Sequence, residues 1–242
     1  MHLHSNIIGE GQPFIILHGF LGMGDNWKTL AKQFSGLGFQ VHLVDQRNHG
    51  RSFHDSEFNY DVLAADLKTY CSHHNLQNIV LLGHSMGGKT AMLFAALYPE
   101  IVSKLIVADI SPRFYPVHHD AILEGLSALD FEAITSRKEA EVIISKYIEN
   151  VSVRQFLLKN LYWEEKGKLA WKINIPVLSD NILEISEWGE HLENISVPTL
   201  FIRGDQSDYI TDEMFDFIES KFDDVQIKTV ENSGHWVHAE NP

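Results

Sequence analysis

The sequence predicts an α/β protein with a mostly parallel sheet that is flanked by helices. Three observations lead to this fold class. Short apolar runs recur along the chain without the apolar–polar alternation of a half-exposed strand. Segments with helical spacing of apolar residues separate these runs, which is the element order of a doubly wound sheet. Polar residues close several of the runs, as expected where strand ends line a ligand crevice.

The expected strands of the first half are four apolar runs, at residues 14–17, 40–44, 78–82 and 104–108. Patterns with helical spacing separate them, at residues 27–34, 60–71 and 87–98. The carboxyl ends of parallel strands meet at one edge of a sheet, where ligands bind. The residues expected near that edge are therefore His18, Asp45, Ser85 and Asp109.

The pattern changes in the middle of the chain, where helical spacing continues without clear parallel strands and aromatic residues are frequent. Ser136 and Glu139 have the spacing of a capping box, which predicts a helix start. We interpret residues 113–195 as a helical cap, or lid, inserted after the strand that ends near Asp109. The alternative is a continuation of the sheet with ordinary core aromatics.

The strand–helix order resumes after the cap, so a single domain is expected. Its α/β core comprises residues 1–112 and 196–242. The remaining elements are a strand at 198–202, a helix at 212–221 and a strand at 225–230. A domain of this kind would usually end in one more helix beyond Pro242, so a truncated C-terminus is one interpretation.

Composition argues against several partners and compartments. The formal charge of −14 disfavours binding to nucleic acid or anionic membranes. No apolar run approaches the ~20 residues of a membrane span, and the N-terminus lacks a basic region followed by an apolar run. Cys71 is the only cysteine and lies in a helical pattern, so we expect a core residue rather than a nucleophile. A single thiol without a disulfide fits a cytoplasmic protein.

The stretch Gly83-His84-Ser85-Met86-Gly87 fits the pattern G-x-S-x-G between an expected strand and an expected helix. In that setting a sharp turn lifts the serine hydroxyl above the sheet, and glycines keep the turn free of clashing side chains. The helix that follows directs its N-terminal amides toward the same point. Ser85 is therefore the candidate nucleophile, and the Met86 N–H is a candidate oxyanion donor.

A second oxyanion donor is expected from the loop after the strand at 14–17. Gly19 lets that loop approach closely, and the Phe20 N–H is the candidate donor. We interpret His18 as a hydrogen-bonded structural histidine rather than a catalytic one. Asp45 is expected to pin its own loop.

Position selects the general base among 14 histidines. His235 follows the last expected strand and satisfies the chain order serine, acid, histidine. His238 is its nearest competitor. No H-E-x-x-H motif occurs and no histidine pair has metal-ligand spacing with acidic partners, so no metal site is expected. The adjacent pairs interpreted as surface residues are His73-His74 and His118-His119.

The acid that would support His235 has several candidates. Its usual position, three residues beyond the glycine that closes the strand, holds Ser207. Asp208 is displaced from this position by one residue, and Asp205 lies too close to the strand. Asp109 stands at the end of the preceding sheet strand and could reach the imidazole from there. A carboxylate after the penultimate strand or at the end of the preceding sheet strand could hold the imidazole tautomer and stabilise the imidazolium.

Five stretches together resemble an α/β-hydrolase. They are 18–20 (HGF), 45–52 (DQRNHGRS), 83–88 (GHSMGG), 109–112 (DISP) and 234–236 (GHW). The chain is most similar to the small esterase/thioesterase branch typified by the bacterial YbfF esterase and the mitochondrial abhydrolase-domain proteins. The resemblance covers nearly the whole chain and is weakest in the cap.

This resemblance implies hydrolysis of carboxylic esters or thioesters of small-to-medium acyl groups, through a serine acyl-enzyme and without a cofactor. The expected partner is a small-molecule acyl ester or thioester. In YbfF-like esterases the usual acid position can carry serine, while an aspartate after the earlier strand assists the histidine. Ser207 and Asp109 fit that arrangement, and Asp208 and Asp205 stay open as alternatives.

Two other functions are compatible with this sequence. A carbon–carbon bond hydrolase or lyase shares the same fold and the same constellation. A non-catalytic ligand-binding protein could also use this fold, although the presence of both Ser85 and His235 argues against it.

Overall fold

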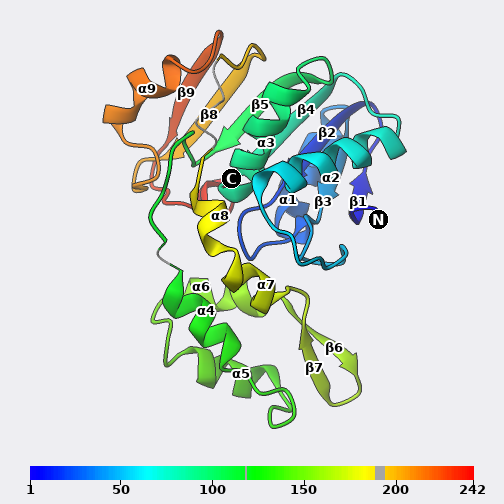
Figure 1. The fold of residues 1–242 in the computed structure, drawn as a ribbon, viewed down its shortest axis with the longest axis vertical. Helices are drawn as coiled ribbons and strands as arrows, with labels where there is room; N and C mark the ends of the chain where they lie inside the picture. Colours follow the sequence, from blue (N-terminus) through cyan, green and yellow to red (C-terminus); the bar gives the residue numbers. More distant parts are fainter. Residues whose placement is uncertain (118, 189–193) are drawn as a thin grey trace.

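The computed structural model describes residues 1–117, 119–188 and 194–242. Within those residues the main sheet has seven strands in the order β1-β3-β2-β4-β5-β8-β9. Figure 1 shows this sheet with helices packed against it. The strands are β1 (Ser5–Ile8), β2 (Gln12–Leu17), β3 (Phe39–Val44), β4 (Ile79–His84), β5 (Val102–Ala108), β8 (Thr199–Gly204) and β9 (Val225–Val230).

Strand pairing in the main sheet is parallel except between β1 and β3. The mostly parallel α/β fold predicted from the sequence is thereby confirmed. The edge strand β1 was not predicted. It pairs from Ser5 opposite Val44 to Ile8 opposite Val41. Because it is short and only partly buried, it lacks the continuous apolar run that marks the inner strands.

Neighbouring residues of β2 face opposite sides of the sheet. Ile15 packs with α2 (Tyr60–His73) and α3 (Met86–Leu97). Ile16 packs on the other face with α1 (Lys28–Gly36). Both side chains are fully buried, so β2 must be apolar on both faces. This two-sided cover explains why the inner strands show no alternation in the sequence.

The helices of the core differ from the expected ranges mainly at their ends. The pattern at 27–34 divides into the short helix η1 (Gly24–Trp27) and α1. The pattern at 212–221 divides into η2 (Asp212–Met214) and α9 (Phe215–Glu219), and α10 (Val237–Glu240) follows β9. No helix within the described residues is long and apolar enough to cross a membrane.

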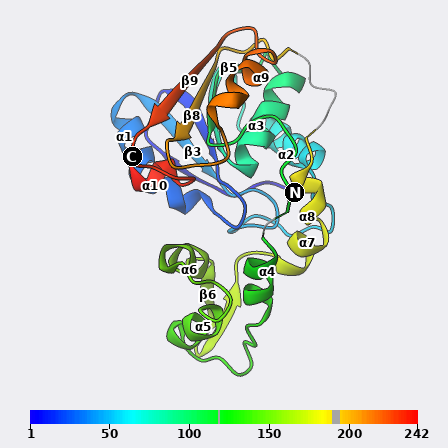
Figure 2. The same cartoon turned by 90° about the vertical axis from the view of Figure 1, so that its left-hand side faces the viewer.

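Residues 113–195, called the inserted segment below, join β5 to β8. Figures 1 and 2 show that most of this segment lies to one side of the sheet, with α8 nearest the core. Its helices are α4 (Asp120–Ser127), α5 (Arg137–Ile144), α6 (Val151–Leu158), α7 (Ile175–Asp180) and α8 (Ile182–Ser186). The Ser136 hydroxyl accepts a hydrogen bond from the Glu139 N–H and caps α5, as its sequence spacing indicates.

A two-stranded hairpin within the inserted segment was not predicted. Strands β6 (Leu161–Glu165) and β7 (Lys168–Trp171) pair antiparallel to each other, apart from the main sheet. Gly167, with φ 88°, makes the tight turn between them possible. The aromatic residues of β6 belong to this hairpin and not to a helix face. β6 and β7 include charged residues, so they lack the continuous apolar run that predicts a buried strand.

Side-chain amides attach the inserted segment to the loops of the core. The Asn160 side chain donates to the Leu21 carbonyl over 2.8 Å. The Asn174 backbone N–H donates to the Asn48 carbonyl over 3.0 Å, and its side chain donates to the Asn48 side chain over 3.2 Å. The segment therefore has fixed contacts with the loops that follow β2 and β3.

Lys89 makes a third attachment, from the helix that follows Ser85. Its buried ammonium donates to the carbonyls of Ser186 (3.0 Å) and Glu187 (2.9 Å) at the end of α8. The rings of Tyr60 and Tyr115 lie 5.5 and 5.2 Å from the same nitrogen, within cation–π range. Burial lowers the pKa of Lys89 to about 7. The ammonium thus fastens α8 to α3.

Cys71 belongs to α2 and is buried in the core cluster that includes residues of the sheet. Burial raises the pKa of its thiol to about 12. A thiol that stays protonated is a poor nucleophile, so the environment of Cys71 agrees with a packing role.

Buried histidines should make the protein sensitive to acid. Burial lowers the pKa of His18 to about 4, of His49 to about 3 and of His238 to about 4. In the unfolded chain these rings titrate near ~6.5. Below that pH the unfolded state binds more protons than the folded state, so the free energy of unfolding falls as the pH falls. The loss should level off once the folded-state pKa values are passed.

Urea unfolding at pH 7, 6, 5 and 4 measures this dependence. While a ring is protonated only in the unfolded state, it contributes a slope of about 1.4 kcal/mol per pH unit. His238→Gln should flatten the slope, whereas the exposed His73→Gln should leave it unchanged. Equal slopes in the wild type and His238→Gln would contradict the assignment.

Candidate active site

Ser85 lies at the turn between β4 and α3, where its φ is 52°. A non-glycine residue rarely adopts this left-handed conformation, so the surrounding backbone must hold it. The Ser85 N–H donates to the Ala108 carbonyl over 3.0 Å, which ties the turn to β5. A Cβ atom on Gly83 would collide with the Gly87 backbone, and one on Gly87 would collide with the end of β2. The turn therefore requires both glycines.

A hydrogen-bonded chain runs from Ser85 through His235 to Asp109. The Ser85 Oγ lies 3.0 Å from His235 Nε2, and His235 Nδ1 lies 2.8 Å from Asp109 Oδ2. An ionised carboxylate only accepts hydrogen bonds, so Nδ1 carries the ring proton and Nε2 is the acceptor for the serine hydroxyl. This arrangement can take a proton from Ser85 and stabilise the charge that then forms on the ring.

Asp109 is fully buried at the end of β5, and its carboxylate is held from several sides. Its own N–H donates to the Ile202 carbonyl over 2.8 Å, which aligns it with β8. Asp109 Oδ1 accepts from the Gly204 N–H over 3.1 Å. Asp109 Oδ2 accepts from the Ser207 hydroxyl as well as from His235. Ser207 thus contacts the carboxylate and supports it.

The other two candidate acids lie outside this chain of hydrogen bonds. Asp208 and Asp205 are both exposed. The Ser233 N–H donates to Asp205 Oδ1 over 3.0 Å, and hydrogen bonds from Ser233 and other backbone N–H groups lower the pKa of Asp205. Asp205 therefore fixes the loop that carries His235. The geometry favours Asp109 as the partner of the imidazole.

The loop after β2 approaches the nucleophile at Gly19. A Cβ atom there would lie 3.2 Å from the Ser85 Cβ and 2.9 Å from the His84 ring. The His18 ring holds this loop, because Nδ1–H donates to the Gly19 carbonyl (2.8 Å) and Nε2 accepts from the Gln46 N–H (3.0 Å). Both ring nitrogens are used in this way, and burial keeps the ring neutral. His18 is placed as a structural residue.

Two further side chains fix the same loop. The Leu21 N–H donates to the buried His49 Nε2 over 3.2 Å. Asp45 accepts from the Gly24 N–H over 2.7 Å and from the Arg51 N–H over 2.9 Å. Asp45 therefore pins its own loop and also joins it to the start of η1.

Phe20 and Met86 are the two candidate oxyanion donors, and both line a small cavity at Ser85. Phe20 directly follows Gly19, and both residues line cavities that Ser85 also lines. Met86 is the first residue of α3, so its N–H is one of those without an acceptor inside the helix. Their role as oxyanion donors stays a prediction.

His238 takes no part in the chain of hydrogen bonds. Its ring stacks on Trp27 at 4.0 Å with an interplanar angle of 14°. His84 lies next to it and donates from Nε2 to the His235 carbonyl over 2.8 Å. Burial lowers the pKa of His84 well below its usual value. These rings support the loop of His235 while staying neutral.

A family model for the alpha/beta hydrolase fold matches residues 12–242. The chain belongs to the α/β-hydrolase family. The solved structure of a marine microorganism esterase superimposes with a TM-score of 0.96 at 43% identity, covering 100% of this chain and 95% of that one. An sn-1-specific diacylglycerol lipase of Mus musculus is 37% identical over 235 residues, which are 94% of this chain and 76% of the lipase.

The chain is also similar to a member of the bacterial esterase branch that its motifs resemble. The esterase YbfF of Escherichia coli is 34% identical over 234 residues, which are 96% of this chain and 89% of the esterase. The resemblance inferred from the sequence is thus confirmed. This chain is a hydrolase of the esterase/lipase type.

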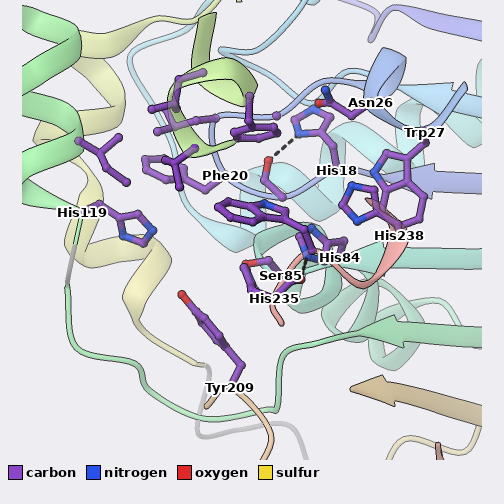
Figure 3. A pocket seen from close by; sticks show the side chains of 18 residues that line it. His18, Phe20, Asn26, Trp27, His84, Ser85, His119, Tyr209, His235 and His238 are labelled. Atoms are coloured by element: carbon purple, nitrogen blue, oxygen red, sulfur yellow. Dashed lines mark hydrogen bonds between the residues drawn. The ribbon is translucent and has the colours of Figure 1, made fainter. Parts of the chain in front are cut away.

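The hydrolase has a pocket of about 250 Å³ at Ser85 and His235. Figure 3 shows these two residues at its centre, with Tyr209 on one side and the stacked rings of Trp27 and His238 on another. Its wall combines residues of the core with residues of the inserted segment. The inserted segment contributes His119, Ile122, Val153, Phe156 and Leu157.

The sequence analysis did not assign Tyr209 or His119 to this pocket. The Tyr209 ring stacks on His235 at 4.0 Å with an angle of 19°. The only feature of the sequence that pointed to Tyr209 was its position two residues beyond Ser207. His119 was interpreted as a surface residue, and the structure corrects this, since it is half-buried and lines the pocket beside α4. Its neighbour His118 lies outside the described residues.

Among the candidate acids and Ser207, removing the Asp109 charge should impair turnover most. Asp109→Asn is expected to lower kcat for an ester by about 10⁴, the effect of losing a triad aspartate. Ser207→Ala removes one donor to the carboxylate and should cost about tenfold. Steady-state kinetics with p-nitrophenyl acetate measures both. The exposed Asp208→Asn is the matched control and should keep wild-type kinetics; a crippled Asp208→Asn beside a normal Asp109→Asn would reverse the assignment.

Proposed function

We propose that this hydrolase cleaves carboxylic esters or thioesters of small-to-medium acyl groups through an acyl-enzyme on Ser85. The observation that supports it most is the chain of hydrogen bonds from Ser85 through His235 to the buried Asp109. A serine hydroxyl alone is a weak nucleophile. Here His235 lies within reach of the Ser85 hydroxyl as a base, and Asp109 fixes the orientation of the His235 ring.

In the first step His235 Nε2 takes the hydroxyl proton while Ser85 Oγ attacks the acyl carbonyl. The carbonyl oxygen becomes negatively charged at the N-terminus of α3. The N–H groups of Met86 and Phe20 are proposed to stabilise it, together with the dipole of the helix. Asp109 stabilises the imidazolium that forms at the same time.

In the second half of the reaction the proton held by His235 moves to the leaving alcohol or thiol. The carbonyl re-forms and leaves the acyl group attached to Ser85. Water then attacks this acyl-enzyme while His235 takes its proton, and the acid product departs as Ser85 regains its hydrogen. Each step uses only groups of this chain, the substrate and water, so no cofactor is proposed.

The inserted segment is proposed to act as a cap. Its residues form part of the wall of the pocket at Ser85, so they exclude water and contact the substrate. Within the described residues no cluster of His, Cys, Asp or Glu side chains could hold a metal ion. A cytoplasmic location stays a prediction.

Other functions of the same fold receive less support. A lyase would need a specific acid pocket, whereas a carbon–carbon bond hydrolase shares this constellation. The described lining of the pocket is mainly aromatic, aliphatic and histidine side chains. A ligand-binding protein without activity would not need the complete hydrogen-bonded chain. Assaying a β-diketone beside p-nitrophenyl esters and acyl thioesters separates these reactions.

Ser85→Ala should abolish turnover and covalent labelling. The wild type is expected to react with a fluorophosphonate probe and to show one modified residue by mass spectrometry. Ser85→Ala should show none, because the attacking oxygen is gone, while circular dichroism confirms that it is folded. Ser233→Ala, in the loop before His235, is a matched serine control that should still be labelled. Labelling that persists in Ser85→Ala would rule out the nucleophile.

A further inference from the structure

Among the described residues, two cavities of very different size meet at Ser85. The larger, of about 250 Å³, is the pocket in Figure 3. The smaller has a volume of about 40 Å³. Both are lined by Ser85, Phe20, His119 and Tyr209. An acyl carbon attached to Ser85 would therefore stand at a junction, with one substituent in each cavity.

His235 decides which part of an ester enters which cavity. The ring must give its proton to the leaving oxygen, so that oxygen has to lie within about 3 Å of Nε2. His235 and Trp236 line the larger cavity and are absent from the described lining of the smaller one. The leaving group must therefore extend into the larger cavity. The acyl chain, on the other side of the carbonyl carbon, must enter the smaller one.

We propose that the smaller cavity is the acyl pocket and that this hydrolase is specific for short acyl groups carried on larger apolar alcohols or thiols. This assignment rests on the proposed ester hydrolysis at Ser85. It adds to that proposal which side of the ester the enzyme selects by size.

The volumes set the expected length of the acyl group. A cavity needs a volume of about 10–15 Å³ to hold one water-sized group. The smaller cavity, of about 40 Å³, therefore holds on the order of three heavy atoms. Acetyl, propionyl and butyryl groups fit this size. The larger cavity has room for a ring or an extended alkyl chain.

The wall of the small cavity is held in place on the side of the inserted segment. Ile182 and Ile185 of α8 line it. The Tyr60 hydroxyl donates to the Ile185 carbonyl over 2.8 Å. Lys89, which also lines the cavity, binds the carbonyls at the end of α8. Because these bonds fix α8 to α2 and α3, the cavity cannot widen around a longer acyl chain without breaking them.

The large cavity has a different wall. Ile122 of α4 lines it, with Val153 and Phe156 of α6 and with Trp27 of the core. These side chains are apolar, so they favour an apolar leaving group. Ile122 and Ile182 make a matched pair, since both are half-buried isoleucines of the inserted segment and each lines one cavity.

Two ester series test the assignment on the purified protein. p-Nitrophenyl esters from acetate to decanoate vary only the acyl group, and n-alkyl acetates from ethyl to octyl vary only the alcohol. We expect kcat/KM to peak between acetyl and butyryl and to fall at least tenfold by octanoyl, since each misfitting methylene can cost roughly tenfold or more. Along the acetate series kcat/KM should hold or rise. Octanoyl esters hydrolysed faster than acetyl esters would overturn the assignment.

The matched variants separate the two cavities. Ile182→Ala should move the optimum of the acyl series to longer chains and leave the profile of the alkyl acetates unchanged. Ile122→Ala should change the alkyl acetate profile and keep the acyl optimum. The reverse pattern would assign the cavities the other way round. If neither series shows turnover that depends on Ser85, the proposed function itself fails and the assignment with it.

Discussion

The buried carboxylate of Asp109 is the group on which the geometry of the active site depends. An unpaired charge inside a protein is costly, so this carboxylate must be fully hydrogen bonded. Its donors come from the end of β8, from the loop behind that strand and from the loop after β9. Each donor therefore has a fixed place relative to β5. His235 is oriented because the carboxylate needs its N–H, and Ser85 then meets the opposite side of the same ring.

Most of this site could be predicted from the sequence because it lies at strand ends. A parallel sheet brings its strand ends to one edge, so Ser85, Asp109 and His235 could be assigned to the same place from order alone. The choice between Asp109 and Asp208 could not be made with equal certainty, since one residue in a loop changes which way a side chain points. Ser207 resolves the difference physically: its hydroxyl occupies the usual acid position and donates to the carboxylate that stands one strand away.

The pocket wall was beyond prediction for a different reason. His119 and Tyr209 come from irregular segments, where no period ties sequence to direction. The hairpin β6–β7 and the edge strand β1 were missed because their sequences include polar or charged residues and lack the continuous apolar runs that predicted the inner strands. The cavity sizes depend on how the inserted segment rests on the core, through contacts such as Asn160 with Leu21. Contacts between distant residues of this kind leave no mark in local spacing.

The position of Lys89 limits how the inserted segment can be exchanged between enzymes of this fold. The helix that follows Ser85 carries the buried Lys89 nitrogen, whose two oxygen acceptors belong to the inserted segment. A transplanted segment without carbonyl groups at that place would leave the buried Lys89 nitrogen without its hydrogen-bond acceptors, four residues from Ser85. The inserted segment and Lys89 must therefore be exchanged together.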